Sequence, residues 1–271
     1  MRKMLWMAGE RTLISAIIPK GAAHINSLMT IDFQDYNMMV LLEGLFSSVP
    51  YDFLVKIAGK DNMHAESAGA LPIIESVYDG EIKIRSLMLN ALNDLYSELW
   101  EDLYERTFLS VSWAKSDPRL CPSRFTTLTS KWTWDTPLRT DYERRQALVE
   151  LDVLTAMALG MTLDQLKTIY RIQFPVLQSY EADTFYDVNG RIAFTINRSL
   201  IGVGVDRPTW ENTLRHLKPG ETYRKTYTDD TQPGGPVERT IEYVAPFDRC
   251  DREEDYETAW KFFSEKYGER R

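Results

Sequence analysis

Residues 140–165, which read TDYERRQALVELDVLTAMALGMTLDQ, contain the start signals of two successive helices. Thr140 followed three residues later by Glu143 is typical of a capping box, in which the glutamate side chain reaches back to the Thr140 amide at the start of a helix. Apolar residues then recur at helical spacing, and Gly160 suits the left-handed residue that ends a helix. A second box of this kind, Thr162–Gln165, predicts that another helix begins at once.

Helical spacing also appears on both sides of this stretch. It predicts a short helix from about Tyr36 that ends near Pro50, and a long amphipathic helix over residues 82–106. A proline suits the first turn of a helix, so Phe174-Pro175 can start another. The acidic cap in Asp251–Glu254 predicts a terminal helix with an apolar face.

Strands are predicted in small groups. Residues 10–19 are apolar and partly β-branched and read as a buried strand. Asn189-Gly190 tolerates positive φ at both central positions, which predicts a tight hairpin. The predicted strands are residues 10–19, 51–57, 185–188, 191–194, 223–228 and 239–244. These elements predict a mixed α/β (α+β) fold, with helices, small strand groups and the 82–106 helix as a long connector.

Composition narrows the class of protein. The 271 residues are 44% hydrophobic, which is enough apolar material for a sizeable core. The 32 Lys and Arg against 40 Asp and Glu give a net charge of −8, which is unusual for a protein that grips nucleic acid by itself. Apolar runs are too short to span a bilayer, and the basic start is not followed by an export signal. We expect a soluble cytoplasmic protein with no membrane partner and two reduced cysteines.

One window departs from the acidic average. Residues 106–145 carry eight basic and four acidic residues, and residues 108–137 show no regular periodicity. Aromatic and basic side chains alternate in this irregular segment, a composition suited to base stacking and phosphate contact. They are Trp113, Lys115, Arg119, Arg124, Phe125, Lys131, Trp132 and Trp134. The alternative, of equal weight, is that the tryptophans fill a seam between domains.

The chemistry of methyl transfer is missing from this sequence. Adenine methyltransferases hold the flipped base with an Asn-Pro-Pro-aromatic or Asp-Pro-Pro-aromatic turn. The nearest string, Asp117–Leu120, lacks the second proline and the aromatic ring, and Gly202–Gly204 is too short for a nucleotide loop. We therefore expect no catalytic, cofactor-binding or metal-binding residues in this chain.

A metal-dependent nuclease is the less favoured catalytic alternative. Asp79, Glu81 and Lys83 match the second half of the acidic pattern that holds magnesium, with Asp52 or Asp61 as the distant acid. Such spacing arises readily by chance in a chain with 27% charged residues. The three histidines have no ligand spacing.

Four strings together resemble a known family. They are Gly9–Ser27, the Gly59-Lys60 loop that closes at Leu71-Pro72, Trp132–Thr195 and Ala245–Trp260. They resemble the C-terminal region of large fused restriction-modification enzymes, in which an adenine methyltransferase domain precedes a target-recognition region. Phage-defence methyltransferases of related build look similar. The strings span nearly the whole chain, and the long central one is specific.

The resemblance implies a DNA target-recognition module that is not catalytic alone. It implies that duplex DNA and a methyltransferase catalytic subunit are the partners, and that S-adenosylmethionine is bound by that subunit. The parts are then residues 1–80, which resemble half of a target-recognition domain, 81–138 with the long helix and basic aromatic loop, and 139–271 with the hairpin and terminal helix.

The expected DNA contacts are Lys20, Lys60, Asn62, Arg119, Arg124 and Lys131. Arg144 and Arg145 are expected to touch phosphates or to form pairs on the helix surface. The alternative from another class is an interaction scaffold that docks on the methyltransferase subunit.

Overall fold

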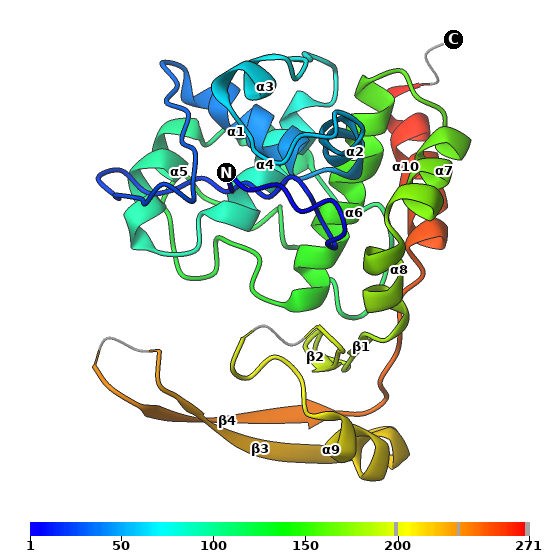
Figure 1. Ribbon diagram of the computed structural model, residues 1–271. Helices are drawn as coiled ribbons and strands as arrows, with labels where there is room; N and C mark the ends of the chain where they lie inside the picture. Colours follow the sequence, from blue (N-terminus) through cyan, green and yellow to red (C-terminus); the bar gives the residue numbers. More distant parts are fainter. Residues whose placement is uncertain (198–199, 232–233, 269–271) are drawn as a thin grey trace.

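The computed structural model describes residues 1–197, 200–231 and 234–268. Helices make up 43% of it and strands 10%, which confirms the mixed fold. The helices form one body, and a smaller part with two antiparallel hairpins lies beside it (Figure 1). The chain leaves the helical body after α8, builds the smaller part and returns through α10 (Figure 1).

The helical body is arranged around α6. This helix packs against α1, α2, α4, α7 and α10. The helices of the body are α1 (Tyr36–Phe46), α2 (Val49–Ile57), α3 (Ala65–Gly69), α4 (Asp79–Asn90), α5 (Ser97–Leu103), α6 (Asp141–Ala158), α7 (Leu163–Gln173), α8 (Pro175–Ala182) and α10 (Arg252–Tyr267), with short 3₁₀ turns η1 (Asp94–Tyr96) and η2 (Arg106–Ser110).

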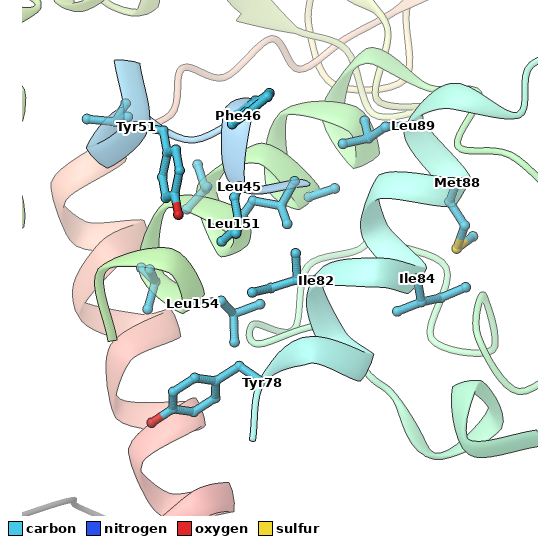
Figure 2. Close-up of a cluster of buried hydrophobic side chains, with 14 of the residues drawn as sticks. Leu45, Phe46, Tyr51, Tyr78, Ile82, Ile84, Met88, Leu89, Leu151 and Leu154 are labelled. Carbon is cyan, nitrogen blue, oxygen red and sulfur yellow. The ribbon is translucent and has the colours of Figure 1, made fainter. Parts of the chain in front are cut away.

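Apolar side chains from three of these helices meet at the centre of the body. Figure 2 shows Leu45 of α1, Ile82 of α4 and Leu151 of α6 pointing toward one another, and each is fully buried. Burial of one such side chain stabilises the fold by roughly 1.5–3 kcal/mol. This hydrophobic cluster runs from Leu5 to Phe263 and takes residues from all three predicted parts of the chain.

The smaller part has its own apolar cluster around Trp210. The Trp210 ring stacks on Phe194, with ring centroids 5.3 Å apart, and contacts Phe247 edge-on. The elements are β1 (Phe185–Tyr186), β2 (Ile192–Phe194), α9 (Arg207–Asn212), η3 (Leu214–His216), β3 (Thr222–Asp229) and β4 (Val237–Val244). The predicted hairpins over residues 185–194 and 223–244 are therefore confirmed.

The predicted caps are largely confirmed. The Thr140 hydroxyl accepts from the Glu143 amide at 3.2 Å, and the Thr162–Gln165 box is reciprocal. Gly160 has a φ of +70° after α6. The second half of the first box is wrong, because the Glu143 side chain binds Arg124 instead.

The single helix over residues 82–106 is wrong. The chain leaves helical geometry after Asn90 and resumes it in η1, where the Asn93 side chain accepts from the Leu95 amide. The Ala91 carbonyl, which would continue the helix, accepts from the Trp132 indole at 2.9 Å. Side chains thus take over the backbone groups that a continuous helix needs.

Two predicted strands are also wrong. Residues 10–19 pair with no strand, because the amides of Thr12 and Leu13 donate to the Asp52 carboxylate at 3.0 and 2.9 Å. Residues 51–57 belong to α2, which Ser48 caps. In the first hairpin, the predicted positive φ occurs at Gly190 and not at Asn189.

Hydropathy gives one further result for the described part of the chain. No single helix there has both the length and the apolar composition to cross a membrane. Only α1 and α2 taken together meet that test, with a 75° bend between them.

Candidate nucleic-acid interface

Arg119 is held within the protein. Its guanidinium donates to Asp117 at 2.8 Å and lies 4.1 Å from the centre of the Tyr142 ring. The Tyr142 hydroxyl donates to the same carboxylate at 2.7 Å. Burial opposes the ionisation of Asp117, but the hydrogen bonds from Arg119 and Tyr142 outweigh it and hold the pKa of Asp117 well below its usual range.

Arg124 is engaged in the same manner. It donates to both oxygens of Glu143 at 2.9 Å, and the Glu143 side chain is buried. Lys131 differs, because its side chain is 77% exposed and pairs with Glu101 at 3.0 Å. The expectation that Arg119 and Arg124 present free guanidiniums is therefore wrong, whereas Lys131 stays a prediction.

The aromatic residues of the middle segment divide in the same way. Trp113 and Phe125 are buried and pack edge to face at 4.9 Å. Trp132 is partly buried against the main core. Trp134 is exposed and lies under the Arg139 guanidinium, 3.9 Å from the ring centre. Three of the four aromatics thus pack in or against the main core, and Trp134 alone of the four is exposed.

Paired charges continue through the helical body. Arg85 is fully buried between Glu81 and Glu150, with nitrogen–oxygen distances of 2.5 Å to each. Arg145 joins Glu181 to Asp255 at 2.8 and 2.6 Å, so it forms buried pairs and does not face a phosphate.

Glu181 carries a second arginine in this network. Arg252 donates to Glu181 at 3.0 Å and to Asp152 at 2.6 Å. Burial raises the pKa of Glu181, but Arg252 and Arg145 outweigh it and set that pKa at about 2. The neighbouring Arg144 donates to the backbone carbonyls of Leu89 and Leu138.

A different surface forms at the N-terminal segment. Residues 1–5 lie between residues 25–29 and residues 60–63, and backbone hydrogen bonds join them on both sides. The Lys3 amide donates to Ser27 at 2.9 Å, and the Met63 amide donates to the Lys3 carbonyl at 2.7 Å. We call these three segments the N-terminal layer.

The N-terminal layer gathers cations and side-chain amides. Its polar side chains other than Asp61 and Ser27 are Arg2, Lys3, Asn26, Lys60 and Asn62. Lys3 Nζ donates to Asn26 Oδ1 at 2.9 Å, and Met4 pairs with Asn62 across the backbone. Among the described residues, none of Arg2, Lys3 and Lys60 forms an ion pair with a carboxylate.

The sequence-based predictions therefore separate by location. Lys60 and Asn62 lie in the N-terminal layer, and Lys20 lies outside it at an exposed turn, 3.6 Å from Glu98. Sequence reasoning missed Lys3 and Asn26. The signal in the sequence that indicates Lys3 is the basic start of the chain, Arg2-Lys3.

The residues of the nuclease alternative do not act together. Asp79 accepts from Ser76 at the start of α4, Glu81 binds Arg85 and Lys266, and Lys83 binds Glu105 at 2.7 Å. Within the described ranges, no group of three or more His, Cys, Asp or Glu side chains is placed to hold a metal ion.

Comparison with known proteins adds no relative. No protein-family model, no curated protein and no solved structure matches this chain.

Proposed function

We propose that this chain is the DNA target-recognition module of an adenine methyltransferase of the restriction-modification type, and that it contacts duplex DNA with the N-terminal layer. One observation carries the proposal. Arg2, Lys3 and Lys60 lack carboxylate partners within the described structure and lie on adjoining segments with Asn26 and Asn62. The arginines of the middle segment and of the core are, by contrast, largely neutralised within the protein.

These side chains have the chemistry that duplex recognition needs. Lysine and arginine hold phosphates and fix the register of a protein on DNA. An asparagine side chain can read an adenine edge in the major groove through two hydrogen bonds. In this proposal the lysines position the module, and Asn26 and Asn62 contribute to reading the base sequence.

The proposal divides the work between two polypeptides. Methyl transfer and S-adenosylmethionine binding belong to a catalytic partner in the cytoplasm, and this chain recognises the target sequence on the DNA. The net charge of −8 supports that division, because an acidic protein repels DNA except at its cationic surface. Non-specific binding by this chain alone should consequently be weak.

The test is a fluorescence anisotropy titration of a labelled duplex with the full chain at several salt concentrations. We expect binding at low salt and a linear fall of log K with log salt, with a slope of about −0.9 for each phosphate contacted. Lys60→Glu should weaken binding and reduce the magnitude of the slope by about one. The matched control is Lys261→Glu on α10, an exposed lysine, which should bind DNA like the parent chain. Failure to bind any duplex at low salt, or equal effects of the two reversals, would contradict the proposal.

A second candidate is an interaction module that docks on the methyltransferase subunit. Exposed apolar side chains favour it, because Met4, Trp6 and Ile25 are 64%, 63% and 75% exposed on or beside the N-terminal layer. Contiguous exposed apolar surface marks interaction sites. Unchanged DNA binding after reversal of both Lys3 and Lys60 would favour this candidate over DNA recognition.

A further inference from the structure

A cavity of the described structure lies beneath residues 15–33. It has a volume of about 500 Å³ and is closed on the other side by α1 and α5. Apolar side chains such as Ile17, Phe46 and Leu99 form much of its wall. Pockets of this size and composition are typical of sites for small organic molecules.

One buried acid lies in this wall. Glu43 of α1 is only 7% exposed and forms no ion pair with a described side chain. Its Oε1 accepts from the Ser47 hydroxyl at 3.1 Å, and the Ser15 hydroxyl lies beside it. The amino group of Met1 is the cation near Glu43, but it donates to the Met29 carbonyl and forms no ion pair with Glu43. A buried carboxylate without an ion-pair partner is costly, so the site favours a guest that supplies one.

The charged groups at the rim of the cavity also favour a cationic guest. Asp32, Glu98 and Asp102 line the cavity against Lys20, His24 and Met1, whose amino group is charged. Lys20 lies 3.6 Å from Glu98, and the His24 ring bonds Thr30. The lining therefore carries an excess of negative charge.

We propose that this cavity binds a small organic cation that consists of a primary ammonium group on an apolar body. The ammonium group pairs with the Glu43 carboxylate, and the apolar body packs on Ile17, Phe46 and Leu99. The proposal is independent of DNA recognition, because none of the side chains assigned to DNA, which are Arg2, Lys3, Asn26, Lys60 and Asn62, lines the cavity.

The site should respond to pH. Burial raises the pKa of Glu43 to about 7, against the hydroxyls of Ser15 and Ser47 and the amino group of Met1, which lower it. That amino group donates to the Met29 carbonyl at 2.8 Å. A primary ammonium keeps its proton well above this range, since its pKa is about 10. The cation should therefore bind more tightly as Glu43 loses its proton between pH 6 and pH 8.

The experiment measures binding of hexylammonium, 1-hexanol and hexanoate to the full chain by calorimetry at pH 6 and pH 8. Hexylammonium should bind best, and its affinity should rise by about tenfold, following the ionised fraction of a group with a pKa near 7. Glu43→Gln should remove both the preference over hexanol and the dependence on pH. Equal affinity for hexanol, an affinity independent of pH, or no binding of hexylammonium would overturn the proposal.

Three further variants separate the causes. His24→Gln should keep the dependence on pH, because the proposal assigns that dependence to Glu43 alone. Leu99→Trp should reduce binding of hexylammonium and hexanol alike by filling the cavity, which tests the location if Glu43→Gln does not fold. Lys60→Glu should leave hexylammonium binding unchanged, so that a failure of DNA recognition is distinguished from a failure of this site.

Discussion

At the scale of single residues, the defining feature is the pairing of buried charges. Arg85 has no exposed surface and lies between Glu81 and Glu150, while the rings of Phe125 and Phe263 flank its guanidinium at 5.5 Å. The sequence shows each of these residues as one more charge on a helix. Arg85 and Glu150 lie 65 residues apart in the sequence. A local sequence pattern therefore cannot predict that they pair.

Loss of the Arg85 charge should be strongly destabilising. Arg85→Met leaves two buried carboxylates without their common partner, and removal of one side of a buried pair typically costs about 3–5 kcal/mol. Urea unfolding should show this loss in the free energy of unfolding. Lys131→Met, which breaks an exposed pair with Glu101, is the comparison and should cost no more than about 1 kcal/mol. Similar losses in the two variants would show that Arg85 is not buried as described.

Glu43 should make stability depend on pH in a definite direction. Burial raises its pKa in the folded chain from 4.5 to about 7, so the folded state binds the proton more tightly than the unfolded state. Its contribution is favourable below pH 4.5 and is lost as the pH rises through 7. Glu43→Gln removes this term, and the free energy of unfolding of the variant relative to the parent should therefore increase by about 2 kcal/mol from pH 5.5 to pH 8. A relative stability that is constant across this range would contradict a buried, protonated Glu43.

At the scale of elements, the packing of α1 on α4 depends on a glycine. A Cβ placed on Gly44 would lie 2.5 Å from the Ile82 side chain and 3.3 Å from its carbonyl oxygen. Gly44→Ala should therefore force the helices apart and cost about 1–3 kcal/mol. Gly69→Ala in α3 meets no atom within 4 Å and should be neutral or slightly stabilising. Thermal unfolding of the two variants measures the difference, and equal melting temperatures would refute the close approach.

The elements that could be predicted are those with local causes. Thr140, Thr162 and Asp251 cap the helices that follow them, because a cap needs only the next few residues. The strand predicted over residues 10–19 failed for a distant cause, since Asp52 takes its amide groups. Local sequence determines where a helix or a turn begins. Tertiary contacts determine which backbone amide groups remain free to form the hydrogen bonds of a β-sheet.

At the scale of the whole molecule, many cations of the helical body pair with carboxylates inside the protein. Cations without such a partner lie at several places on the described surface, among them the N-terminal layer, Lys218 and Lys261. Gly59 predicts a loop at Lys60, which places this lysine among the predicted DNA contacts. Lys3 and Asn26 could not be predicted, since the layer that unites them forms only when residues 1–5 pair with segments about 25 and 60 residues along the chain. The basic window over residues 106–145 predicts cations available to phosphates, but Arg119 and Arg124 pair with carboxylates in the folded chain.

Site-specific photocross-linking can establish whether DNA lies against the N-terminal layer, as we propose. A benzophenone amino acid replaces either Met4 or Trp134, whose side chains are 64% and 67% exposed, and each variant is irradiated with labelled duplex DNA at low salt. We expect a cross-link from position 4 in the N-terminal layer and none from position 134 in the middle segment. A cross-link from position 134 alone would contradict the proposal.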